Sequence, residues 1–131
     1  MTTVPEVTCR VLLADDDETN RLVAAESLKY LGAEVLTVAK GSEVLQALSD
    51  RRFDLLILDV HMPDMSGIEV TMRIRQHERS TGKTHLPIVA LTASATVKDQ
   101  QSCLDAGMDQ VLTKPFRIEE LGAVIQARCK T

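Results

Sequence analysis

The stretch LLILDVHMPDMSG, residues 55–67, carries the clearest indication of fold class in this 131-residue chain. It begins with four aliphatic residues, Leu55 to Leu58, a pattern typical of a central strand buried on both faces. A carboxylate, Asp59, follows directly, and Gly67 opens a segment of helical periodicity. A buried strand, a polar turn and a helix in this order predict one βα unit of a parallel sheet.

The same alternation of short apolar runs and helical stretches continues along the whole chain. Strands are expected at Arg10–Ala14, Glu34–Val38, Phe53–Leu58, Ile88–Leu91 and Gln110–Thr113. The first helix carries a helical repeat of Leu22, Val23, Leu28 and Leu31 and stops at Gly32; the others are expected at about Ser42–Ser49, Gly67–Glu78, Val97–Asp105 and Ile118–Arg128. This pattern predicts an α/β fold with a five-stranded parallel sheet covered by helices on both faces.

The ends of these elements carry further local patterns. Ser42 and Ser66 stand where their hydroxyls can accept hydrogen bonds from free N–H groups at helix starts. The polar segment Arg79–His85 interrupts the helical period, which predicts a surface loop before the fourth strand.

Length and composition limit the class of protein. A chain of this size forms one domain, which we assign to residues 9–129, with residues 1–8 as an extension or linker. No apolar run approaches the roughly 20 residues of a membrane span, and the N-terminus lacks a secretory signal, so we expect a cytoplasmic location. A net charge of −4 and an aromatic content of 2% argue against direct nucleic-acid binding.

The chain has three cysteines, Cys9, Cys103 and Cys129, and no C-x-x-C spacing. An odd number without such spacing argues against both a disulfide framework and a zinc site. We therefore expect three reduced thiols.

Polar residues follow four of the predicted strands. Asp15-Asp16-Asp17 follows the first, Asp59 the third, Thr92 the fourth and Lys114-Pro115 the fifth. In an open parallel sheet these positions share one edge, where ligands bind. Clustered carboxylates repel one another unless a cation neutralises them, and Mg²⁺ with its oxygen ligands suits a shallow, acidic site. The set fits phosphoryl transfer to an aspartate.

The acidic residues differ in how readily a structural role explains them. Asp17 stands where a helix cap is expected, and capping alone accounts for it. Asp59 directly follows a buried apolar strand, where a merely solvated carboxylate is unusual. Asp59 is therefore the predicted phosphoryl acceptor.

Four motifs together resemble the receiver domains of two-component signalling. They are Leu13-Ala14-Asp15-Asp16, the segment from Leu58 to Gly67, Ala90-Leu91-Thr92-Ala93 and Thr113-Lys114-Pro115-Phe116. They occur in the order of that family, each at a predicted strand end. The resemblance covers nearly the whole chain and implies a doubly wound, flavodoxin-like sheet.

The resemblance also implies a role for each site residue. Asp59 takes a phosphoryl group from a phosphohistidine, and Asp15, Asp16, Asp59 and the backbone carbonyl of His61 hold Mg²⁺. Thr92 donates a hydrogen bond to the phosphoryl group and Lys114 forms a salt bridge with it. In this family the Lys114–Pro115 bond is cis, and the domain assists its own phosphorylation and dephosphorylation without being an enzyme in its own right.

Three further residues, His61, Ser94 and Val111, stand close to the predicted site residues in the sequence. The His61 imidazole is not expected to bind the metal, and the resemblance implies that His61 and Ser94 tune the rate of phosphate loss. Val111 stands where the family commonly has a Tyr or Phe that moves inward on activation. An aliphatic side chain cannot report phosphorylation by that ring movement, although Thr92 and the helix at Val97–Asp105 could still shift together.

Other classes of protein explain these residues less completely. Asp15-x-Asp17-x-Thr19 also fits the nucleophile motif of a haloacid-dehalogenase-type phosphatase, but that class leaves Asp59 without a role and places Glu119-Glu120 on a helix. A Rossmann or P-loop nucleotide site would need glycine in the first strand–helix turn, which is acidic here. A receiver-like module that is never phosphorylated would be expected to lack one of the site residues, and none is missing.

The resemblance leaves the context of the domain open between a stand-alone receiver and part of a longer protein. The segments Leu91–Ala95, Ala106–Asp109 and Arg79–His85 are similar to receivers fused to hybrid sensor histidine kinases. In that setting the partners are the phosphohistidine of the parent kinase and a histidine phosphotransfer domain. Such a partner is expected to dock over the Asp59 edge of the sheet and the first helix, without membrane contact by this domain.

Overall fold

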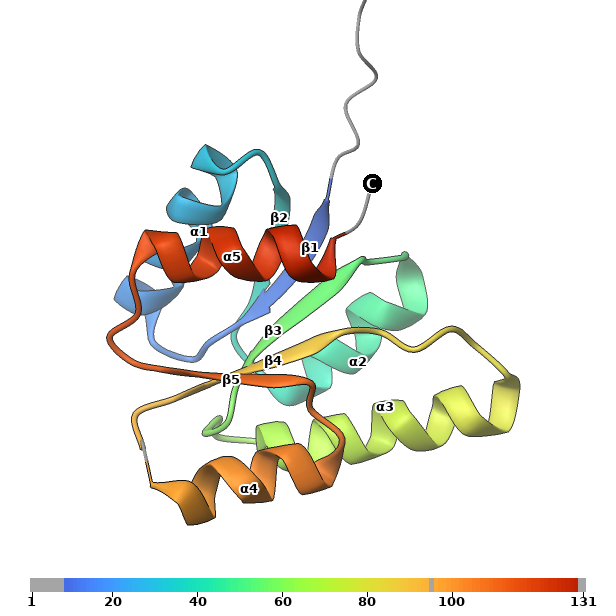
Figure 1. Cartoon of the computed structure of the whole chain (residues 1–131). Coiled ribbons are helices and arrows are strands. Elements are labelled where there is room, and N and C mark those ends of the chain that lie inside the picture. The colour runs from blue at the N-terminus through green and yellow to red at the C-terminus, as the bar shows by residue number, and fades with distance from the viewer. Residues whose placement is uncertain (1–8, 95, 130–131) are drawn as a thin grey trace, which may run out of the picture.

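The computed structural model describes residues 9–94 and 96–129 of the chain. Strands and helices alternate strictly (Figure 1). The strands are β1 (Arg10–Ala14), β2 (Glu34–Val38), β3 (Leu55–Asp59), β4 (Ile88–Thr92) and β5 (Gln110–Thr113). The helices are α1 (Glu18–Tyr30), α2 (Gly41–Asp50), α3 (Gly67–Thr81), α4 (Val97–Ala106) and α5 (Ile118–Arg128).

The five strands form one parallel sheet in the order β2-β1-β3-β4-β5. Successive side chains of each strand point to opposite faces, so the sheet has two separate cores. One core packs the sheet against α1 and α5, through residues such as Leu13, Ile57 and Leu121. The other packs it against α2, α3 and α4, through residues such as Leu58 and Ile74. The predicted five-stranded α/β fold is confirmed.

β3 is buried along its whole length, as its aliphatic run predicts, but its bounds are shifted. Residues 53 and 54 precede it. Asp54 still contacts β1, because its N–H donates to the carbonyl of Arg10 and its side chain accepts from the N–H of Arg10, both at 2.8 Å. Asp59 is the last residue of the strand. The sheet therefore holds the predicted acceptor, Asp59.

The first and third helices extend beyond the predicted segments. α1 buries Ala24, Ala25 and Leu28, whereas Leu22 and Val23, which the helical repeat would place with the core, are 62% and 58% exposed. α3 continues to Thr81, so the predicted loop starts at Gly82, whose left-handed φ of 72° ends the helix.

Two of the three predicted helix caps, Asp17 and Ser66, are confirmed. Asp17 accepts a hydrogen bond from the N–H of Asn20, and Ser66 accepts one from the N–H of Glu69. Ser42 does not cap α2. Its N–H and that of Gly41 donate to the carboxylate of Asp64, at 3.0 and 2.8 Å, so a residue from a distant loop satisfies this helix start.

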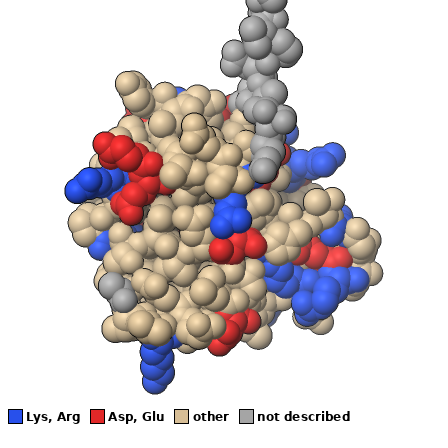
Figure 2. Space-filling model, in the orientation of Figure 1, with Lys and Arg blue, Asp and Glu red and all other residues tan. Residues whose placement is uncertain are grey.

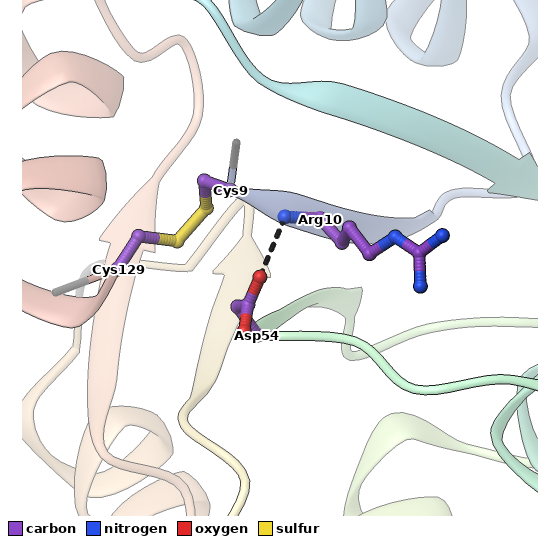
Figure 3. Close-up of a disulfide and its surroundings, with 4 residues drawn as sticks. All are labelled: Cys9, Arg10, Asp54 and Cys129. Atoms are coloured by element: carbon purple, nitrogen blue, oxygen red, sulfur yellow. Dashed lines mark hydrogen bonds between the residues drawn. A yellow bond between two sulfur atoms is a disulfide. The ribbon is translucent and has the colours of Figure 1, made fainter. Parts of the chain in front are cut away.

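The expectation of three reduced thiols is wrong. Cys9, just before β1, and Cys129, just after α5, form a disulfide with their Cα atoms 5.7 Å apart (Figure 3). Cys103 is a free thiol buried in the other core. The two bonded cysteines are 120 residues apart, so their proximity depends on the fold and not on local spacing.

Charged side chains form small groups on the face shown in Figure 2, where Lys and Arg alternate with Asp and Glu between larger uncharged areas. Within residues 9–94 and 96–129, no helix is long and apolar enough to cross a membrane. The assignment of residues 1–8 to an extension or linker falls outside the described residues.

Candidate phosphoacceptor and metal site

The carboxyl ends of four strands bring the predicted site residues together. Asp15 and Asp16 directly follow β1, Asp59 ends β3, and Thr92 ends β4. Lys114 follows β5, and its bond to Pro115 is cis, as the resemblance implies. Because all strands are parallel, these residues share one edge of the sheet.

Three carboxylates form the centre of the site. Asp15, Asp16 and Asp59 each offer one oxygen, and these oxygens lie within 4.8 Å of one another. Asp15 and Asp59 are buried, with 1% and 5% exposure, whereas Asp16 is exposed. Asp17 is not in this group, because its side chain caps α1. Three hard oxygen donors with one open side fit a magnesium ion that keeps several water ligands.

Two further groups complete the site. The ammonium of Lys114 lies 3.2 Å from Asp15 Oδ2 and 3.4 Å from Asp59 Oδ2. Thr92 is buried, and the N–H of Lys114 donates to its carbonyl at 2.8 Å, which fixes the ends of β4 and β5 to each other. The site thus combines a nucleophilic carboxylate, a cation and a hydroxyl, which are the groups that phosphoryl transfer to an aspartate needs.

Burial and neighbouring charges change the proton affinity of the two central groups. Burial raises the pKa of Asp59 from its ordinary 3.8 to about 6, although the N–H of His61 and the charge of Lys114 oppose the rise. Burial by itself would lower the pKa of Lys114, but the charges of Asp59 and Asp15 outweigh it and raise that pKa. Lys114 therefore stays protonated at neutral pH and can balance added negative charge.

The raised pKa of Asp59 predicts a pH dependence of stability in metal-free protein. The folded state binds the Asp59 proton more tightly than the unfolded chain does. Protonation of Asp59 therefore stabilises the fold; this stabilisation is fully present below about pH 4 and is lost as the pH rises through about 6. Wild type should lose about 1 to 2 kcal/mol relative to Asp59→Asn between about pH 4 and pH 7. Urea unfolding of both proteins with a chelator measures this difference. A difference that stays constant over this range would contradict the prediction.

The residues beside the predicted acceptor, Asp59, occupy distinct positions. The N–H of His61 donates to Asp59 Oδ1 at 3.1 Å, and His61 is exposed to solvent. The N–H of Ser94 donates to Thr92 Oγ1 at 3.1 Å, and its hydroxyl donates to Asp99. Val111 packs against the core between the sheet and α4. An aliphatic side chain therefore occupies the position where the family commonly has Tyr or Phe.

Sequence reasoning missed one contact of the site. The side chain of Arg21, on α1, donates to the backbone carbonyl of Asp15 at 2.8 Å. This bond fixes the first turn of α1 to the segment that carries Asp15 and Asp16. An arginine on a predicted helix carries no pattern that distinguishes such a contact from solvent exposure.

Sequence comparison gives the same assignment as the geometry. The family model described as response regulator receiver domain matches residues 11–126. The sensor protein GacS of Pseudomonas syringae pv. syringae is 41% identical over 116 residues, which is 88% of this chain. The chain spans only 13% of the length of that curated relative.

Two solved structures are similar over nearly the whole chain. The receiver domain of the sensor histidine kinase PA1611 from Pseudomonas aeruginosa, with magnesium in its active-site cleft, has a TM-score of 0.83 and 34% identity, covering 92% of this chain and 97% of that one. The receiver domain of Saccharomyces cerevisiae Ssk1, in complex with the histidine phosphotransfer protein Ypd1, has a TM-score of 0.87 and 26% identity, covering 93% and 90%. The chain is therefore a member of the response regulator receiver domain family of two-component signalling.

Proposed function

We propose that Asp59 is the residue of this receiver domain that accepts the phosphoryl group. An Asp59 oxygen attacks the phosphorus of a phosphohistidine and the histidine nitrogen leaves, which forms an aspartyl phosphate. Thr92 donates a hydrogen bond to the new phosphoryl group and Lys114 balances its charge. The supporting observation is the convergence of Asp59, Asp15 and the Lys114 ammonium, within 3.4 Å of the ammonium nitrogen, at one edge of the sheet.

Asp15, Asp16 and Asp59, together with the backbone carbonyl of His61, would hold Mg²⁺ in this proposal. When bound, Mg²⁺ neutralises the charge that develops on the phosphoryl oxygens. The cluster of three carboxylate oxygens supports this assignment. The Lys114 ammonium contacts two of the three carboxylates and offsets part of their negative charge.

Mapping the phosphate on the full chain tests the proposal. The protein is incubated with Mg²⁺ and a small phosphodonor such as acetyl phosphate, digested, and analysed by mass spectrometry. We expect one phosphoryl group, on Asp59, and none when a chelator replaces Mg²⁺. Phosphate on Asp15 or on another residue would overturn the assignment.

We further propose that the chain is the receiver part of a hybrid sensor histidine kinase and relays phosphate in the cytoplasm. Its similarity to a sensor protein of which it spans 13% supports this context. The donors are then the parent's phosphohistidine or a histidine phosphotransfer domain, as in the complex of Ypd1 with the Ssk1 receiver. The domain assists its own phosphorylation and dephosphorylation, and residues 9–129 form it, after an N-terminal extension at residues 1–8.

The exposed side chains at the start of α1 suit a docking surface for that partner. Leu22 and Val23 are more than half exposed, and they lie in the same helix whose first turn Arg21 fixes to the Asp15 segment. Exposed apolar side chains next to an active site commonly mark an interface.

Substitution at this surface should separate the two kinds of donor. In Leu22→Ser/Val23→Ser, transfer from a phosphorylated histidine phosphotransfer domain that serves the unaltered chain should fall about tenfold or more. Phosphorylation by acetyl phosphate should be unchanged, because that donor needs no docking surface. Met72→Ser, at a similarly exposed position on α3, is the matched control. Equal transfer rates in all three proteins would exclude α1 from the interface.

A further inference from the structure

The Cys9–Cys129 pair lies outside the phosphoacceptor site. Cys9 stands at the amino end of β1, while Asp15 and Asp16 follow the carboxyl end of the same strand. Both cysteines pack into the core between the sheet, α1 and α5. Their Cα separation of 5.7 Å is near the most common value for disulfides.

The backbone around each cysteine is held without help from the sulfur bond. The carbonyl of Cys9 accepts from the N–H of Glu34 at 2.9 Å, and the N–H of Cys129 donates to the carbonyl of Ile125 at 2.8 Å. The guanidinium of Arg128 donates to the carbonyl of Asp109 at 3.3 Å. The fold itself therefore keeps the two side chains adjacent, and reduction leaves two neighbouring thiols.

The three cysteines differ in their access to solvent. Cys129 is half-buried, whereas Cys9 is 7% exposed. Cys103 is 2% exposed in the other core, and burial raises the pKa of its thiol. Because the thiolate is the reactive form and must reach its reagent, Cys129 is the thiol best placed to react first.

We propose that Cys9 and Cys129 form a reversible redox-modification site that exchanges with a low-molecular-weight disulfide such as oxidised glutathione. The Cys129 thiolate attacks one sulfur of oxidised glutathione, which forms a mixed disulfide and releases one glutathione thiolate. The Cys9 thiolate then attacks the Cys129 sulfur and releases the second. Two protein thiols are oxidised to one disulfide, one glutathione disulfide is reduced to two thiols, and the two protons pass to the released glutathiones.

The bond connects the two ends of the domain. It joins the residue before β1 to the residue after α5, so its loop encloses every strand and helix. Figure 1 shows the start of β1 beside the end of α5. Oxidation therefore stabilises the domain by restricting the unfolded chain, and it holds together the points where the polypeptide enters and leaves. The Asp59 edge, at the other ends of the strands, is left unchanged.

Glutathione exchange with two matched variants tests the order of attack. The reduced full-length protein is incubated with excess oxidised glutathione, and the remaining thiols are alkylated under denaturing conditions before intact mass is measured. Wild type should carry no glutathione and show one alkylated cysteine, Cys103. Cys9→Ser should accumulate one glutathione on Cys129, and Cys129→Ser should react about tenfold more slowly. Wild type with three alkylated cysteines, or equal adduct formation in both variants, would overturn the proposal.

Thermal unfolding tests the structural consequence. Oxidised wild type should melt about 10 to 20 °C above the reduced form, and this difference should vanish in Cys9→Ser and Cys129→Ser. Phosphorylation by acetyl phosphate should proceed equally in oxidised and reduced wild type, which also confirms that both forms are folded. Equal melting temperatures in the two forms would contradict the stabilising role.

Discussion

Asp59→Asn is expected to reduce phosphate incorporation from acetyl phosphate in the presence of Mg²⁺ by at least about 1,000-fold. The side chain of Asn has nearly the same size, so the end of β3 should keep its geometry. The amide lacks the carboxylate that we propose as the nucleophile, and the substitution also removes one proposed metal ligand. Radiolabelled phosphodonor or intact mass measures the loss, and circular dichroism checks that the variant is folded.

Asp17→Asn is the matched control for this experiment. Asp17 caps α1 by accepting from the N–H of Asn20, and Asn caps helices about as well as Asp. Incorporation in Asp17→Asn should therefore stay within about twofold of wild type. The control also tests the phosphatase alternative, in which Asp15 is the nucleophile and Asp17 assists it. Retained incorporation in Asp59→Asn combined with loss in Asp17→Asn would favour that alternative.

The sequence is sufficient to predict the positions of the site residues because each of them ends or directly follows a strand. A run such as Leu55–Leu58 predicts a buried strand, and parallel topology brings the residues after all such strands to one edge. Asp59, Thr92 and Lys114 lie where this reasoning places them. Asp17 was separated from the cluster by the same kind of local argument, since a cap depends only on nearby residues.

Contacts between distant residues were not predictable in this way. The carboxylate of Asp64 accepts from the N–H of Gly41 at the start of α2, 23 residues away in the sequence. No local pattern predicts this hydrogen bond. Arg75 is buried on α3, where it forms an ion pair with Asp109 at 2.9 Å. From the sequence alone, an arginine in a helix is expected to be exposed to solvent. The Cys9–Cys129 pair was missed for the same reason, because counting cysteines does not show that the two ends of the domain meet.

The periodicity of the sequence also does not predict that Leu22 and Val23 are exposed. Apolar residues at helical spacing predict a helix, but they do not show which residues face the sheet. On α1 the small side chains of Ala24 and Ala25 face the sheet, beside Leu28. Residues that contradict the expected burial in this way are candidates for function, since the fold does not need them to be apolar.

Gly67→Ala is expected to destabilise the protein by about 2 to 3 kcal/mol. Gly67 is the first residue of α3, and its N–H donates to the carbonyl of Val60 at 2.8 Å. A Cβ at residue 67 would lie 2.6 Å from the carbonyl oxygen of Asp59 and 3.0 Å from the Cα of Val60. These are backbone atoms, so the contact is relieved only by moving the segment that carries Asp59, the proposed acceptor.

The same movement should slow phosphorylation of Gly67→Ala by about tenfold or more, because small displacements of a nucleophile reduce transfer strongly. Gly122→Ala is the matched control. A Cβ at residue 122, inside α5, would meet Leu31 Cδ2 at an ordinary 3.5 Å, so alanine there should stabilise the helix by up to about 1 kcal/mol. Urea unfolding and acetyl phosphate kinetics on both variants measure the contrast. A Gly67→Ala protein within about 0.5 kcal/mol of wild type would show that the turn after β3 can move without cost, and that close backbone packing does not hold Asp59 in place.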